Sequence, residues 1–197
     1  MIIHKQKSQG ENPDKMTIFA RRERVPPFHG WKLSKHQINM DTPKVAVIMG
    51  STSDYDIMSQ AIAFLEELGI EVVKKVISAH RTPDLMCEFA KSARANGISV
   101  IIAGAGGAAH VAGVVAGMTT VPVIGVPIQT KALGGLDSML SIIQMPPGIP
   151  VATMAINGAK NAGLYAAQIL SLSNPQIEAA LLEFRRKQTE KVLAAEI

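Results

Sequence analysis

Two polar segments carry side chains that can bind a phosphate and move a proton. The first, Gly50-Ser51-Thr52-Ser53-Asp54, places three hydroxyls and a run of backbone amides just before a helical pattern. A helix N-terminus favours anions, because its amides are unpaired and the helix dipole is positive there. Ser51 and Ser53 can therefore hold a phosphate, although a serine here also serves as an ordinary helix cap. Asp54 would repel a phosphate in direct contact, so ribose hydroxyls or an amine suit it better.

The second segment, Ser78-Ala79-His80-Arg81-Thr82-Pro83, follows another apolar run. His80 can exchange a proton near neutral pH, which makes it a candidate acid and base. Arg81 can hold an anion with the planar fork of donors on its guanidinium group. Most histidines are not catalytic, and taken alone this pair is more typical of an ordinary imidazole beside a solvated charge.

A third segment consists almost entirely of very small residues and contains Gly104, Ala105, Gly106, Gly107, Ala108, Ala109 and His110. It differs from the dinucleotide fingerprint G-x-G-x-x-G, because alanine occupies the last position and no acidic residue follows about 20 positions later at a strand end. Its small side chains allow close backbone approach to a flat heterocycle or a trapped small molecule. The same residues also suit tight packing of a helix on a sheet.

Five short apolar runs predict the strands that position these segments, at residues 45–49, 72–77, 100–103, 123–126 and 151–156. A helical pattern follows each of them, which is typical of a parallel sheet with helices on both faces. We expect an α/β fold with a flavodoxin-like, doubly wound sheet in three α/β/α layers and a single domain. Ligands of such sheets bind beyond the carboxyl ends of the strands, where the polar segments lie.

The helices are expected at residues 57–68, 83–96, from the Gly/Ala segment to 118, 136–145, 159–170 and from 175 toward 196. Thr82 is a suitable N-cap for the second, and Pro83 suits a first helical position. The methionines within 139–145 indicate a core or subunit contact rather than a cofactor site.

The composition excludes several classes of function. Hydrophobic residues make up 47% of the 197 residues and aromatic residues 4%, which suits a packed core better than a surface that stacks bases. The single cysteine, Cys87, allows neither an intrachain disulfide nor a cysteine cluster for metal. HExxH, CxxC, GxSxG and Walker motifs do not occur, so we expect no metal site and neither hydrolase nor kinase chemistry.

Localisation is predicted to be cytoplasmic. The sequence contains no apolar run long enough for a membrane span and begins without the apolar core of a secretory signal. A lone cysteine is consistent with a reducing compartment. We therefore expect no membrane partner.

Residues 1–39 form a basic zone of their own, with 8 Lys/Arg and 3 Asp/Glu, whereas residues 40–197 carry a net charge of −1. The surplus of positive charge thus resides in this segment, and the body has no basic stripe for nucleic acid. We expect a flexible extension (1–39), a catalytic α/β domain (40–174) and a C-terminal helix (175–197) that packs on a neighbouring subunit. A targeting peptide, or Met40 as the natural start, are the alternatives for the extension.

Taken in order, the segments closely resemble 5-(carboxyamino)imidazole ribonucleotide mutase, the bacterial phosphoribosylaminoimidazole carboxylase catalytic subunit of class I. The resemblance spans about residues 44–190 and rests on five segments, at 49–54, 78–83, 103–110, 122–127 and 137–146. It implies an isomerase of purine and inosine monophosphate biosynthesis that needs no cofactor. In this reaction a carbamate loses carbon dioxide, which stays trapped and is attacked by carbon 4 of the imidazole.

By this resemblance His80 is the acid–base residue, which protonates the carbamate nitrogen and later removes the ring proton. Ser51, Ser53 and Asp54 would hold the ribose and phosphate, and Ser78 and Arg81 the phosphate. Ala79 and the wall residues Gly104, Ala105, Gly106, Gly107, Ala108 and His110 would line the remaining pocket. The resemblance also implies a homo-octamer and functional coupling to a carboxyaminoimidazole ribonucleotide synthetase.

The chain departs from the family after His110, where Val111-Ala112 replace the usual Leu-Pro, and we expect a more mobile loop there. The Arg81-Thr82 pair resembles the mutase branch rather than the animal-type branch that uses free carbon dioxide. Direct carboxylation of aminoimidazole ribonucleotide is the close alternative. A flavodoxin-like flavin-binding module without this chemistry and a nucleic-acid binder recruited through the basic segment are more distant alternatives.

Overall fold

The computed structural model describes residues 43–196, which form a five-stranded sheet in the order β2-β1-β3-β4-β5, with every neighbouring pair parallel. The strands are β1 Lys44–Met49, β2 Glu71–Val76, β3 Ile98–Gly106, β4 Val123–Ile128 and β5 Ala152–Thr153. This order is that of the flavodoxin-like doubly wound sheet. The predicted fold class is therefore confirmed.

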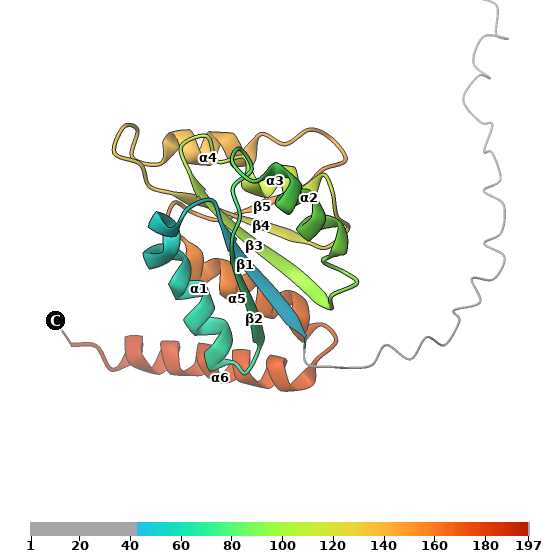
Figure 1. Ribbon diagram of the computed structural model, residues 1–197. Helices are drawn as coiled ribbons and strands as arrows, with labels where there is room; N and C mark the ends of the chain where they lie inside the picture. Colours follow the sequence, from blue (N-terminus) through green and yellow to red (C-terminus); the bar gives the residue numbers. More distant parts are fainter. Residues whose placement is uncertain (1–42, 197) are drawn as a thin grey trace, which may run out of the picture. The chain divides into compact units, whose positions relative to one another are not determined.

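The helices lie in two layers on opposite faces of the sheet (Figure 1). One layer contains α1 (Tyr55–Glu67), α5 (Ala159–Ser171) and α6 (Pro175–Leu193), and the other α2 (Pro83–Ser92), α3 (Val111–Ala116) and α4 (Leu136–Ile143). A 3-10 turn, η2 (Thr52–Asp54), precedes α1. Successive residues of β1 alternate between the two cores, as the two-residue period of a strand requires.

The direction of chain progression reverses between β1 and β3. The chain passes from β1 outward to β2, returns to β3 on the other side of β1, and then proceeds to β4 and β5. The loops after β1 and β3 consequently separate at the carboxyl edge, and this switch point is where ligands of such sheets bind. Gly50 N donates to Gly104 O at 3.2 Å and joins the two loops where they begin to separate.

The boundaries of three strands, β3, β4 and β5, differ from the sequence prediction by two residues or more. β3 extends to Gly106 because β4 continues to pair with it up to the Gly106–Ile128 step. β5 is shorter than the predicted 151–156, since its regular pairing covers two residues of β4. Beyond it, Met154 N still donates to Gly125 O and Asn157 N to Pro127 O, so the segment follows β4 with irregular spacing.

The predicted extension 1–39 lies outside the described residues. Asn174 caps α6 with hydrogen bonds from the backbone N–H groups of Gln176 and Ile177, and Pro175 occupies the first turn. Ile177 and Leu181 are buried in the same core as α1 and α5, whereas Leu182, Val192 and Leu193 are exposed. The described part of the chain contains no helix long and apolar enough to span a bilayer.

Gly125 leaves room for α4 against the sheet, and its replacement by alanine should lower the free energy of unfolding by about 1–3 kcal/mol through overpacking. A Cβ atom there would lie 2.5 Å from Ile142 Cγ2 and 3.1 Å from Val151 Cγ1. Gly117→Ala is the matched control, because its nearest neighbours would be at ordinary distances of 3.6 and 3.7 Å. Urea unfolding of both variants checks this, and equal midpoints would mean that the α4 contact is not tight.

Candidate active site

A cavity of about 310 Å³ lies at the carboxyl edge of the sheet. Its lining comes from the loops after β1, β2, β3 and β4, as expected for the switch point of a doubly wound sheet. The residues that line it are Gly50, Ser51, Ser53, Asp54, Ser78, Ala79, His80, Arg81, Ala105, Gly106, Ala108, Val111, Ile128, Gln129 and Thr130.

The loop after β1 places two hydroxyls together on this cavity. Ser51 caps η2, and its Oγ accepts from Ser53 N at 3.3 Å and from Ser53 Oγ at 2.9 Å. The Ser53 hydroxyl thus has two acceptors for its proton, Ser51 Oγ and, at 3.4 Å, Asp54 Oδ1. Capping and a place on the cavity are thus compatible, since Ser51 caps the turn and both serines line the cavity.

Asp54 is a buried carboxyl on the cavity wall, with 8% of its surface exposed. Burial raises the pKa of Asp54 above its ordinary value, because the ionised form loses hydration. Hydrogen bonds from the Ser51 backbone and the Ser53 hydroxyl, together with the positive charge of Arg81, lower this pKa in part. The cavity wall therefore contains a carboxyl group that is largely shielded from water and can accept hydrogen bonds from a ligand.

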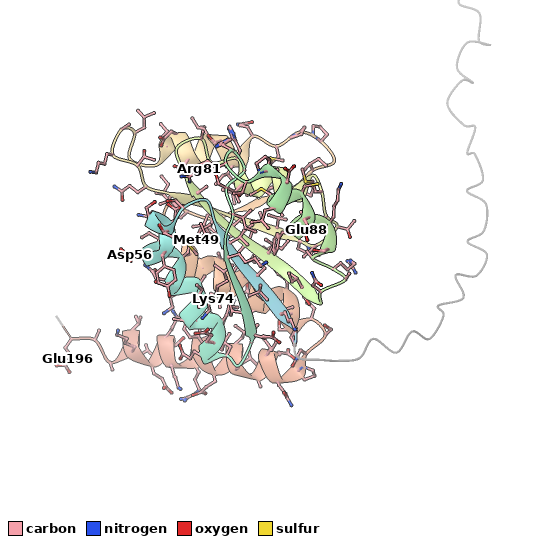
Figure 2. All side chains as sticks on the ribbon, in the orientation of Figure 1. Met49, Asp56, Lys74, Arg81, Glu88 and Glu196 are labelled. Atoms are coloured by element: carbon pink, nitrogen blue, oxygen red, sulfur yellow. The ribbon has the colours of Figure 1, made fainter. Side chains whose placement is uncertain are left out.

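Arg81, labelled beyond Met49 at the end of β1 in Figure 2, is hydrogen-bonded to the loop after β1 and to its own loop after β2. Its Nη2 donates to Gly50 O at 2.9 Å and its Nε to Ser78 Oγ at 3.3 Å. A guanidinium group has five donors, so further N–H groups are available to an anion in the cavity. The two internal bonds orient the fork in advance, which reduces the entropy lost on binding.

The loop after β2 closes on itself through Thr82. Thr82 Oγ1 accepts from Ser78 N and donates to Ser78 O, each at 3.0 Å. Thr82 is the N-cap residue of α2, but its side chain makes no capping bond to the helix. The expected helix-capping hydroxyl instead holds the tight turn that presents Ala79 and His80 to the cavity.

His80 lies against the second histidine of the described residues. His80 Nε2 and His110 Nδ1 are 2.8 Å apart, and the two rings meet edge to face with centroids 4.9 Å apart. A hydrogen bond at this distance needs one proton between the two nitrogens, so the tautomer of one ring determines that of the other. His110 is exposed beside His80 and is not among the residues that line the cavity, so its expected part in substrate binding stays a prediction.

The small residues after β3 divide between wall and packing. Ala105, Gly106 and Ala108 line the cavity, whereas Gly104 and Gly107 do not. A Cβ atom on Gly104 would lie 2.3 Å from Met58 Sδ, so this glycine allows α1 to approach the sheet. Gly107 has a φ of +69°, a left-handed conformation that glycine adopts without strain.

Comparison with known proteins assigns most of the chain to one family. A model of the family described as AIR carboxylase matches residues 44–191. The chain belongs to this family.

Proteins of known name are similar to this chain in sequence and in structure. The N5-carboxyaminoimidazole ribonucleotide mutase of Thermotoga maritima is 56% identical over 151 residues, which cover 77% of this chain and 88% of that protein. The bifunctional purine synthesis protein purC/E of Dictyostelium discoideum is 50% identical over 161 residues, 81% of this chain and 16% of that protein. The crystal structure of Treponema denticola PurE superposes with a TM-score of 0.71 at 28% identity, covering 77% and 94% of the two chains.

The sequence analysis assigned no binding or catalytic role to the residues that follow β4 in this AIR carboxylase site. Gln129 and Thr130 line the cavity, and Asn157 holds Gln129 through two bonds, to its backbone N–H at 2.9 Å and to its side-chain oxygen at 3.1 Å. Asn157 has a φ of +59°, which is uncommon for a residue other than glycine. A polar residue directly after a predicted strand was the available signal for Gln129, whereas its pairing with Asn157 spans 28 residues and leaves no local pattern.

The titration of Asp54 should be visible in the pH dependence of stability. Since the pKa of Asp54 is raised in the folded state above its ordinary value of 3.8, its contribution to stability is full below that value and is lost as pH rises through the folded pKa. Asp54→Asn removes this titration. The free energy of unfolding of the variant, minus that of the wild type, should therefore increase between about pH 4 and pH 7.

Urea unfolding at both pH values measures this difference. Asp56→Asn is the control for loss of a carboxylate at this helix start, because Asp56 is exposed and lies in the first turn of α1, and the rise should be absent from it. A difference for Asp54→Asn that falls with pH would mean that the carboxylate is stabilised rather than destabilised by its surroundings.

Proposed function

We propose that this chain is a mutase that converts 5-(carboxyamino)imidazole ribonucleotide to 4-carboxy-5-aminoimidazole ribonucleotide in purine biosynthesis. The observation that carries the proposal is one cavity that combines an anion-binding side, formed by Ser51, Ser53 and Arg81, with His80 and a wall of alanine and glycine. The mutase names borne by relatives that share more than half of their residues with the chain support this substrate.

The substrate's phosphate would bind the hydroxyls of Ser51 and Ser53 and the free donors of Arg81, with Ser78 orienting the guanidinium group. Asp54 would accept hydrogen bonds from the ribose hydroxyls, which would replace the hydration that the carboxylate lacks. These contacts would leave the imidazole against Ala105, Gly106 and Ala108, where no side chain prevents a flat ring from approaching the backbone.

His80 then has two proton transfers to perform. It would donate a proton to the carbamate nitrogen while the bond between that nitrogen and the carboxyl carbon breaks, and the bonding electrons would stay on the nitrogen. The released carbon dioxide would be attacked by carbon 4 of the electron-rich imidazole, and His80 would then remove the proton from that carbon. The proton given is returned, so the cycle balances without another reagent.

His110 would support the proton transfers of His80 by a hydrogen bond to its ring. Its Nδ1 shares a proton with His80 Nε2, so it fixes the tautomer and the ring orientation of His80 before the substrate binds. A second histidine at this position would also hold the proton that His80 exchanges.

Assembly, partners and localisation are further parts of the proposal. A homo-octamer would cover exposed apolar side chains on and near α4, namely Leu133, Leu136, Leu140 and Ile143, and those at the end of α6. The C-terminal helix would then pack on a neighbouring subunit. A cytoplasmic enzyme would receive its labile carbamate from a carboxyaminoimidazole ribonucleotide synthetase, without nucleic acid or membrane as partner.

The reaction class can be tested by supplying the two substrates separately. We expect rapid conversion of the carbamate and no comparable carboxylation of free aminoimidazole ribonucleotide at low bicarbonate, because carbon dioxide must be generated within the closed site. Rapid turnover of the free amine under those conditions would instead establish direct carboxylation. Flavin bound to the purified chain would favour a redox module.

His80→Asn should abolish turnover and leave binding intact. Asparagine keeps polar contacts in the cavity but cannot exchange a proton, so kcat should fall by about 100-fold or more. Calorimetric titration with the product should give a dissociation constant within a few-fold of the wild-type value, since the phosphate contacts are unchanged. Substantial residual turnover would remove His80 from the mechanism.

A further inference from the structure

One face of α4 bonds to the backs of two loops that line the cavity. At its start, Asp137 accepts from Thr130 Oγ1 at 2.8 and 3.0 Å. Ser138 follows with a hydrogen bond from its Oγ to Ile128 O at 2.6 Å. Since Ile128 and Thr130 lie on the cavity lining, these residues of α4 support the wall contributed by β4.

The same helix holds the loop after β3 at Gly107. Ser138 Oγ accepts from Gly107 N at 2.9 Å. Ser141 Oγ lies 3.1 Å from Gly107 O and 2.7 Å from Asp137 O, so its one hydroxyl proton is shared between these two carbonyls. Gly107 O also accepts from Ala109 N at 2.8 Å. Both backbone polar groups of Gly107 are therefore turned toward α4, while its neighbours Gly106 and Ala108 face the cavity.

Ser138 is placed so that one hydroxyl joins two walls. Its side chain is fully buried, and its Oγ is simultaneously donor to β4 and acceptor from the β3 loop. Loss of the hydroxyl would remove the bond to the part-buried N–H of Gly107 and the buried bond to the Ile128 carbonyl, which displaces the backbone more readily than loss of an exposed bond. The Asp-Ser-x-x-Ser pattern at 137–141 has no part in binding or proton transfer as derived above.

We propose that Ser138 and Ser141 are positioning residues that hold the Gly106–Ala108 wall in place and thereby keep released carbon dioxide beside the imidazole. The proposal rests on the mutase function proposed above. Carbon dioxide is small, uncharged and lacks hydrogen-bond donors, so its retention depends on a wall without gaps rather than on directional contacts. A wall that moves allows it to escape before carbon 4 attacks.

Escape of carbon dioxide can be measured through the product that it leaves behind. Each molecule of carbon dioxide that leaves after the carbon–nitrogen bond has broken leaves behind one molecule of free aminoimidazole ribonucleotide. The ratio of free amine to carboxylated product, after subtraction of the free amine that the labile carbamate forms in buffer without enzyme, therefore measures retention. A merely structural substitution lowers both products together and leaves this ratio unchanged.

The test compares Ser138→Ala, Ser141→Ala and the conservative variant Ser141→Thr in the full chain. Ser92→Ala is the matched control, because Ser92 Oγ donates to Glu88 O four residues earlier just as Ser141 Oγ donates to Asp137 O, but it contacts no loop of the cavity. Each variant is supplied with the carbamate, and both products are separated and quantified against time. Thermal unfolding shows which variants are folded.

We expect the ratio of free amine to carboxylated product to rise about tenfold in Ser141→Ala, as the loss of one hydrogen bond of ordinary strength would allow, and further in Ser138→Ala. Ser141→Thr retains the hydroxyl and should return toward the wild-type ratio, and Ser92→Ala should match the wild type. KM should change little in Ser141→Ala, because Ser51, Ser53 and Arg81 are untouched.

If Ser138→Ala does not fold, the Ser141 pair still decides the outcome. Wild-type ratios in folded Ser141→Ala would overturn the proposal, as would equal ratios in Ser141→Ala and Ser141→Thr. A wild-type chain that converts no carbamate would refute the mutase function and this inference with it. If the wild type converts the carbamate and the variants release no more free amine than the wild type, only the positioning role is refuted.

Discussion

The parallel pairing of β1 with both β2 and β3 is the constraint from which the site follows. Because all three strands run in one direction, their carboxyl ends meet at one edge, and the loops that leave them have to share the space above β1. The hydrogen bonds of Gly50 show how closely the chain segments approach one another there. Gly50 donates its N–H to Gly104 and accepts from Arg81 through its carbonyl, so this residue joins the loops after β1 and β2 to the end of β3. A shift in the register of β1 would separate the serines, the guanidinium group and the small-residue wall.

The polar groups at this edge are held before any ligand is present, largely by bonds within the protein. Ser51 and Ser53 bond to each other, Arg81 bonds to Ser78 and Gly50, and His80 bonds to His110. Such an arrangement favours catalysis because little reorganisation remains when substrate binds. Its cost in stability is the buried carboxyl of Asp54, whose ionised form is less favourable in the fold than in water.

The order of the strands and most of the cavity lining could be predicted from the sequence, because each depends on local patterns. The run Val45–Met49 and the residues directly after it specify a buried strand and its loop within one short window. Features that depend on distant partners could not be predicted in this way. Thr82 has the sequence of a helix cap, yet its hydroxyl bonds to Ser78; His110 lies in the Gly/Ala segment, yet it faces His80 from 30 residues away. The support that Ser138 gives to Gly107 spans 31 residues and likewise has no local signature.

The central claim is that the carboxyl carbon stays within one closed site between its departure from nitrogen and its attachment to carbon 4. The most direct measurement supplies the wild-type chain with a carbamate that carries an isotopically labelled carboxyl carbon, in a large excess of unlabelled bicarbonate. Mass spectrometry of the carboxylated product then reports the origin of its carboxyl group. Retention of the label in nearly all of the product is predicted, whereas product that carries the unlabelled carbon of the solvent would show that carbon dioxide equilibrates with the medium and that the site does not retain it.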